Sequence, residues 1–105
     1  MDYFYKNGEI HQDWEGGQII GFFKTNGEIH KDWEGGQLLG FVKNNEIHKD
    51  WEGGQLLGSV KNAEIHKDWE GGPVIGNTSS YIIHGMEINE AAMVACWHFL
   101  ISPIF

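Results

Sequence analysis

Apolar and polar positions along the chain repeat in blocks of 18 residues, and each block predicts two short β-strands. In residues 46–51, Glu-Ile-His-Lys-Asp-Trp, alternation places Ile47 and Trp51 on one side with Lys49 between them, and a glycine pair and the mostly apolar run 56–60 follow. Apolar residues on one side only are typical of a half-buried strand, and a short apolar run bounded by turn residues is typical of a buried one. The glycine pair in every block leaves no uninterrupted stretch long enough for a stable helix.

The first half of the block recurs almost unchanged at residues 9–17, 28–36, 46–54 and 64–72. Its histidines are 18 positions apart, except that His11 precedes His30 by 19, because the segment Thr25-Asn26-Gly27 holds an extra residue. We therefore divide a single domain, residues 1–105, into repeats at about 4–21, 22–40, 41–58 and 59–76, followed by a partial fifth unit at 77–87.

The repeat extends beyond these copies at both ends. His84 lies 18 residues after His66, and residues 4–8 fit the same place in the block as residues 41–45. The two ends are thus complementary halves of one unit, so the sheet either closes on itself or ends in two caps. Tight turns at sites such as Asn7-Gly8 favour antiparallel neighbours. The predicted fold is mainly β, an antiparallel meander of about ten short strands that is barrel-like or open, plus one C-terminal α-helix.

The C-terminal segment at about 89–102 breaks the repeat and predicts a helix. Asn89 is a good N-cap, Glu90 suits the first turn, and Pro103 ends the segment. Residues 91–101 are apolar on nearly every side but too few to span a bilayer, which needs about 20 residues. A helix that is apolar all round is buried all round. It either fills or crosses the sheet, or it pairs with its copy in a second chain, which makes a homo-oligomer one expected partner.

Alternation also predicts which face of the sheet is buried. Ile47 and Trp51 share one face, predicted to be core, and the Glu, His and Asp of the same strand share the other, predicted to be solvated. The residue after the strand glycine changes from aromatic to polar along the chain, so early units should bury that face and late units expose it. The C-terminal segment is the predicted cover; the changing residues are Phe22, Phe41, Ser59 and Asn77.

Charge and cysteine content limit which classes of partner and which cellular location are expected. The chain has 15 acidic residues, seven lysines and no arginine, for a net charge of −8. Nucleic acid and anionic membranes, which need clustered positive charge, are not expected as partners. The single Cys96 cannot form an internal disulfide, and the first residues lack a basic segment followed by an apolar one. These features favour a cytoplasmic location, and no cofactor is predicted.

Repeated histidines and aspartates raise the question of a metal site. His11, His30, His48, His66 and His84 are equivalent and would form a ring in a closed sheet, with an aspartate two positions after each of the first four. Repetition alone accounts for the same pattern, because duplication copies every exposed position. No unit by itself offers three convergent ligands, and the loops lack the alternating oxygen ligands of calcium loops. We therefore predict no metal.

The four Asp-Trp-Glu-Gly-Gly loops carry the clearest candidate chemistry. A loop tryptophan beside carboxylates that accept hydrogen bonds from hydroxyls is typical of sugar-binding sites, and four copies would make binding multivalent. Against this, the tryptophans share the parity of the core isoleucines, which favours a role in filling the core. The candidate ligand-binding residues are Asp13, Trp14, Asp32, Trp33, Asp50, Trp51, Asp68 and Trp69.

The spacing Trp-x-x-Gly-x-x-x-Gly, as in Trp51, Gly54 and Gly58, resembles the core of MORN-type repeats over about residues 9–76. The MORN pattern places Tyr and Gly before the tryptophan, where this chain has Ile47 and Lys49, and the MORN repeat is longer. The resemblance implies a strand-turn-strand unit and an interaction or scaffolding role, and it implies no functional residue.

Almost every polar residue occurs in four copies, whereas an active site needs one asymmetric cluster, so we predict that the chain is not an enzyme. Any catalytic site would lie in the unrepeated tail around His84, Glu87 and His98. The first functional hypothesis is a non-enzymatic protein that mediates protein–protein interaction or self-association, through the C-terminal helix. The second is a lectin-like multivalent binder of carbohydrate that uses the tryptophan loops.

Overall fold

The computed structural model describes residues 2–105 and contains nine antiparallel strands in one sheet. Each strand pairs with the next one along the chain, which confirms the predicted antiparallel meander. The strands are β1 (Tyr3–Lys6), β2 (Glu9–Gln12), β3 (Ile19–Phe23), β4 (Glu28–Lys31), β5 (Leu38–Lys43), β6 (Glu46–Lys49), β7 (Leu56–Lys61), β8 (Glu64–Lys67) and β9 (Val74–Asn77).

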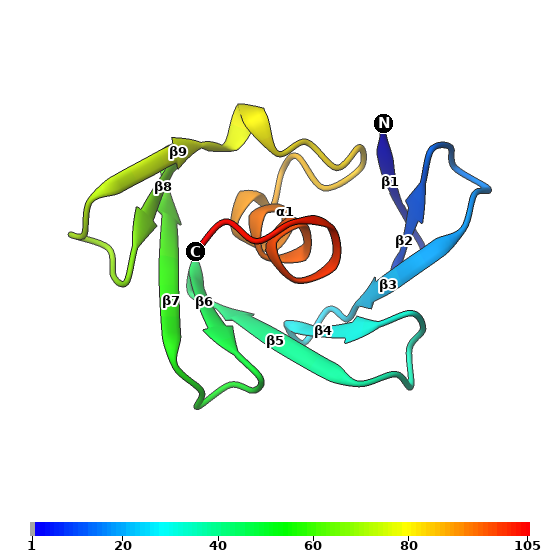
Figure 1. Ribbon diagram of the computed structural model, residues 1–105, viewed down its shortest axis with the longest axis horizontal. Helices are drawn as coiled ribbons and strands as arrows, with labels where there is room; N and C mark the ends of the chain where they lie inside the picture. Colours follow the sequence, from blue (N-terminus) through cyan, green and yellow to red (C-terminus); the bar gives the residue numbers. More distant parts are fainter. Residues whose placement is uncertain (1) are drawn as a thin grey trace.

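The sheet is open and curls around the C-terminal helix (Figure 1). Helix α1 (Glu90–Cys96) begins after Asn89, whose side chain accepts a hydrogen bond from the Ala92 N–H at 3.2 Å. A π-helical turn, Trp97–Ile101, continues it. No helix within residues 2–105 is long and apolar enough to cross a membrane.

The fifth unit does not continue the meander, so the structure has nine strands rather than about ten. A 3-10 turn, Thr78–Ser80, follows β9, and the chain then crosses to the other end of the sheet. There the Tyr5 N–H donates to the His84 carbonyl at 2.8 Å, and the His84 N–H donates to the Tyr3 carbonyl at 2.9 Å. Phe4 and His84 form an isolated parallel bridge. The edge of β1 is therefore covered, while the outer edge of β9 has no neighbouring strand among residues 2–105.

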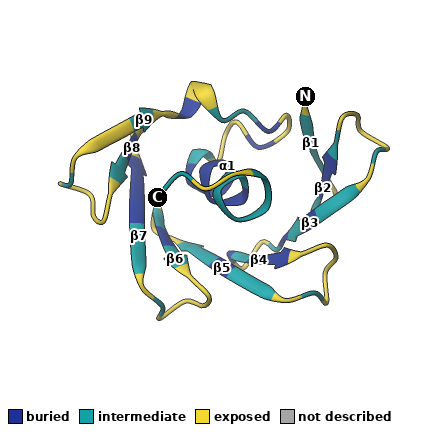
Figure 2. Cartoon of the chain, viewed as in Figure 1, coloured by how far each residue is buried: buried dark blue, intermediate teal, exposed yellow. Residues whose placement is uncertain are grey.

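The inner face of the sheet holds the core, and its isoleucines confirm half of the predicted face assignment. Ile10, Ile29, Ile47 and Ile65 are fully buried, as are most residues of α1 (Figure 2). The strand glycines also face inward. A side chain at Gly21 would collide with Leu100, and one at Gly40 would collide with Phe99. The glycines thus form a trough that receives the C-terminal segment, which explains why an apolar helix can be buried on every side within one chain.

The predicted position of this cover was wrong. Phe22 and Phe41 alternate with the strand glycines and lie on the outer face, opposite to α1, where each ring packs on the glycine of a hairpin turn, Gly8 or Gly27. The predicted trend in exposure also fails at Ser59, which is 2% exposed, although it holds at Asn77, which is exposed. Both errors have one cause: the glycine, and not the residue after it, makes room for the C-terminal segment.

Candidate functional site in the tryptophan loops

Four loops join the paired strands and project outward, away from α1 (Figure 1). We call them the Trp loops: residues 13–17, 32–36, 50–54 and 68–72. Each begins with the Asp-Trp pair that the sequence singled out, and nearly all of their residues are exposed (Figure 2). Within a loop the aspartate and tryptophan are neighbours. Between loops they are separated by strands, so the eight predicted residues form four sites and not one.

The tryptophans are exposed, and the interpretation of them as core residues was wrong. Trp14, Trp33, Trp51 and Trp69 have 60–65% of their surface accessible. The preceding aspartates adopt positive φ, from 67° to 75°, a conformation that Asp tolerates better than most residues. Each strand ends one residue before its aspartate. Side-chain alternation therefore stops at the aspartate. The even sequence spacing between the isoleucine and the tryptophan then no longer predicts that both side chains lie on the same face of the sheet.

Both glycines of each Trp loop are required, for different steric reasons. A side chain on the first, such as Gly16, would lie about 2.6 Å from the ring atoms of Trp14. A side chain on the second, such as Gly36, would collide with the backbone carbonyl of Lys31. The Gly36 N–H also donates to the Trp33 carbonyl at 2.9 Å, which closes the turn. The indole thus lies against its own turn, held in place with much of its surface open to solvent.

Each Trp loop is tied to the sheet by the histidine that precedes it. His30 Nδ1 lies 2.8 Å from the Gly36 carbonyl, and the equivalent distances in the other three repeats are 2.8–3.0 Å. The histidines are consequently buried or half-buried: His11 is 7% and His30 is 9% exposed. The prediction that they lie on a solvated face was therefore wrong. The hydrogen bond to the loop carbonyl offsets the free-energy cost of burying the polar ring.

A glutamate faces the second nitrogen of each of these histidines. In the second repeat His30 Nε2 lies 3.0 Å from a carboxylate oxygen of Glu28. The carbonyl and the ionised carboxylate both only accept, so the doubly protonated imidazolium satisfies both contacts. The hydrogen bond from His30 holds the pKa of Glu28 below its usual value. The corresponding Glu–His distances are 3.0, 3.4 and 3.6 Å in the first, third and fourth repeats.

The second Trp loop differs from the others in its ion pairs. In the first, third and fourth repeats a lysine nine positions earlier pairs with the loop glutamate, at 3.3, 2.8 and 3.7 Å. In the second, the extra residue in 25–27 moves Lys24 out of this register, and it faces Glu28 at 3.8 Å instead. Within residues 2–105, Glu34 has no ion-pair partner. The break in the period was the sequence signal that could have identified Glu34.

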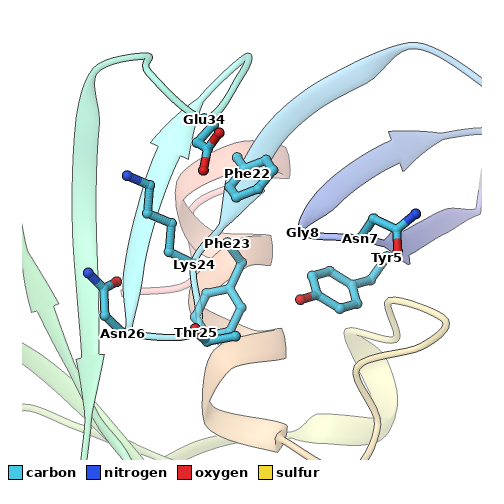
Figure 3. A pocket seen from close by; sticks show the side chains of 9 residues that line it. All are labelled: Tyr5, Asn7, Gly8, Phe22, Phe23, Lys24, Thr25, Asn26 and Glu34. Atoms are coloured by element: carbon cyan, nitrogen blue, oxygen red, sulfur yellow. The ribbon is translucent and has the colours of Figure 1, made fainter.

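Glu34 reaches into a pocket of about 480 Å³ between the first two hairpins (Figure 3). Phe22, Tyr5 and Phe23 also line it; Figure 3 shows Glu34 and Phe22 toward one end of the pocket and the rings of Tyr5 and Phe23 toward the other. These two rings meet edge to face, with centroids 6.4 Å apart. Sequence reasoning missed this pocket because Tyr5 and Phe23 come from different repeats and are replaced by valine, Val42 and Val60, in the later ones.

Other candidate groups are accounted for by packing. No three His, Cys, Asp or Glu side chains gather as a metal-binding group within the described residues, and His84 stacks on Phe4 with a centroid separation of 4.9 Å. Burial raises the pKa of the Cys96 thiol. His98 Nδ1 accepts a hydrogen bond from the Ile104 N–H at 2.8 Å, and burial lowers the pKa of His98. Both features keep its ring neutral.

Comparison with known proteins places the chain in no family. No family model, no curated protein and no solved structure matches it. The resemblance to MORN-type repeats stays a prediction that rests on the spacing of Trp51, Gly54 and Gly58 and of their equivalents.

Proposed function

We propose that this protein is a non-enzymatic, lectin-like binder of carbohydrate that uses its four Trp loops as contact sites. The observation that carries the proposal is the exposure of 60–65% at all four loop tryptophans, on loops whose backbone is fixed by two glycines and a histidine. Exposing a large aromatic ring and holding it still favours stacking against a flat apolar surface, which one face of a sugar ring provides.

The neighbours of the tryptophans favour a sugar over a flat protein surface as their ligand. Every loop tryptophan stands between an aspartate and a glutamate, and charged side chains of this kind are depleted in the centres of protein interfaces. Carboxylates are strong acceptors for hydroxyl groups. Four separate, identical and acidic sites fit a small epitope that recurs along or across a glycan.

The second Trp loop is the expected primary site. Glu34 is free of a lysine partner, so its carboxylate can accept a ligand hydroxyl without first breaking an ion pair. The pocket beside it supplies aromatic walls from Tyr5 and Phe23. In the third repeat, by contrast, Glu52 is held by Lys43 at 2.8 Å.

The test is binding of the labelled protein to an array of immobilised glycans that includes hexoses, N-acetylhexosamines and uronic acids. A glycan that binds is then titrated while tryptophan fluorescence is recorded. We expect the double variant W33A/E34Q to weaken binding by about fivefold or more, equivalent to ~1 kcal/mol. The matched control W51A/E52Q, which changes the same two residues one repeat later, should weaken it less.

Two results would contradict this proposal. One is the absence of binding across the whole array. The other is unchanged binding by a variant in which Trp14, Trp33, Trp51 and Trp69 are all alanine, provided that its circular dichroism matches that of the native protein. Because the loop tryptophans are largely exposed and lie against the glycines of their own turns, we expect this variant to fold.

We propose protein–protein interaction, including self-association, as the second candidate function. The C-terminal helix, which was the predicted contact surface, is replaced by another surface in this proposal, because α1 is buried inside the sheet and is not available to a second chain. The observation that supports it is the open edge of β9, where Val74 is 53% and Ile75 is 39% exposed. Sedimentation equilibrium over a range of protein concentrations tests it, and a strictly monomeric protein would contradict self-association.

A further inference from the structure

Strand β9 is the one sheet edge that the described part of the chain leaves open. At the other end of the sheet, residues 82–85 cover β1 through the hydrogen bonds of His84. Beyond β9 there is no strand, and three of its four residues are exposed (Figure 2). An open edge presents unpaired backbone N–H and C=O groups, which are a template for pairing with another strand.

The repeats identify which backbone groups of β9 are unpaired. In the three preceding units the carbonyl of the equivalent residue accepts from the aspartate N–H of the next strand; Leu57, for example, accepts from Asp68 at 2.9 Å. Ile75 occupies this position in β9, and no further strand supplies the aspartate. The Thr78 N–H donates back to Ala63 beside β8. Ile75 is the extra residue at a register shift, since Ile65 pairs with Gly76 and His66 with Val74, and its carbonyl is the group that the preceding units show directed away from β8. Because the Thr78 N–H faces β8, alternation directs both backbone groups of Asn77 away from β8.

Electrostatics favour close approach of a second copy at this edge. Residues 71–83 carry no charge, in a chain whose net charge is −8. The lysine that ends β5 and β7, Lys43 or Lys61, is replaced by Ser79 in the last unit. Lysine on an edge strand discourages pairing between chains, so the last repeat has lost the residue that would protect it.

We propose that two copies of this chain associate through antiparallel pairing of β9 with β9 about a two-fold axis at Gly76. In this register Ile75 of each copy lies opposite Asn77 of the other, and the Asn77 N–H of each copy donates to the Ile75 carbonyl of the other. Gly76 lies opposite itself as a non-hydrogen-bonded pair. The register is favoured because Pro73, which has no N–H, limits the strand that can pair on one side and the 3-10 turn at Thr78 limits it on the other.

A second copy is the occupant that the structure favours, for two reasons. Each chain has one open edge, so pairing of that edge with itself uses it completely and gives a closed dimer instead of a filament. The uncharged segment also meets its own copy without like-charge repulsion. This inference rests on the self-association proposed above and does not depend on carbohydrate binding by the Trp loops.

The test combines a cross-link with an edge-blocking variant of the full chain. A cysteine at Gly76 has space, because an added side-chain atom would lie 3.6 Å from Tyr81, and the native Cys96 is buried. In a non-hydrogen-bonded antiparallel pair the Cα atoms are close enough for a disulfide. We expect G76C to form a covalent dimer under mild oxidation. Ile88 is 100% exposed and lies away from the edge, so I88C should form little covalent dimer under the same oxidation.

Charge at the edge gives the second measurement. We expect I75K to weaken dimerisation in sedimentation equilibrium by about tenfold or more, because it places two like charges beside the paired strands. The control I88K removes an equally apolar exposed residue elsewhere and should leave the dimer intact. A native dimer that G76C does not cross-link and I75K does not dissociate would overturn the β9 interface while leaving self-association standing. A monomer under all conditions would overturn both.

Discussion

Residues 28–36 and 64–72 have the same nine amino acids, Glu-Ile-His-Lys-Asp-Trp-Glu-Gly-Gly, in different surroundings. Their loops are alike: Asp32 and Asp68 have φ of 67° and 71°, and Trp33 and Trp69 are 65% and 60% exposed. Their Glu–His pairs differ, at 3.0 Å in the second repeat and 3.6 Å in the fourth. Local sequence therefore determines the conformation of the Trp loop, whereas residues on the neighbouring strands determine the Glu–His distance.

The cause of the difference is the residue opposite the glutamate. Glu28 pairs across the sheet with Phe41, and Glu64 pairs with Asn77. The side chain of Glu28 is 28% exposed and that of Glu64 is 54% exposed. The aromatic ring limits access of water to the pair in the second repeat, which strengthens the hydrogen bond between the imidazole ring and the carboxylate.

The largest difference between the two repeats should appear at the strand glycine that follows each nonapeptide. An alanine at Gly40 would collide with Phe99 and with the His48 carbonyl, whereas one at Gly76 meets no atom closer than 3.6 Å. We expect G40A to lower the free energy of unfolding by about 1–3 kcal/mol and G76A to change it little. Urea unfolding of both variants tests this, and equal losses would mean that the trough does not hold the C-terminal segment tightly.

A smaller effect of opposite sign is expected at the turn that precedes each nonapeptide. Gly27 has φ of 106°, and the equivalent Ala63 has φ of 67°, a conformation that is unfavourable for alanine. We expect A63G to raise the free energy of unfolding by about 1 kcal/mol, and thus to remove a weakness of the fourth repeat. Thermal unfolding of A63G beside the native protein measures it. A destabilised A63G would show that the turn is not under strain.

The smallest effect should be the pH dependence of the Glu–His pair. Because the folded pKa of Glu28 is lowered, the stability that it contributes is present above its usual pKa and is lost as pH falls through the folded value. Between about pH 6 and about pH 3, E28Q should therefore lose less stability than the native protein does. E64Q should follow the native curve more closely, since its pair is longer and more exposed. Identical curves for E28Q and the native protein would contradict the pairing.

The fold could be predicted from the sequence because every signal was repeated. Turn residues recur at fixed positions, the isoleucines mark one face, and Asn89 and Pro103 bound the helix. The Trp loops could not be placed in the same way. A positive φ at Asp32 is a local backbone choice that side-chain alternation cannot anticipate, and it reverses the inferred burial of Trp33.

The end of the sheet was also beyond sequence reasoning. Residues 82–84 match the first strand of the repeat, and the sequence contains nothing that distinguishes pairing with β9 from crossing to β1. The 3-10 turn after Asn77 decides between them, because it redirects the chain before a hairpin can form. The pocket at Glu34 has a similar origin, since a one-residue insertion changes which lysine reaches which glutamate.

The position of α1 inside the sheet has a consequence for biosynthesis. The isoleucine column, which comes from β2, β4, β6 and β8, packs against residues that the ribosome makes after them. A nascent chain that ends near β9 can form hairpins, but it has no centre on which to bury Ile10, Ile29, Ile47 and Ile65. Completion of the domain therefore waits for the last residues, and until then the hairpins expose apolar surface that a chaperone would recognise.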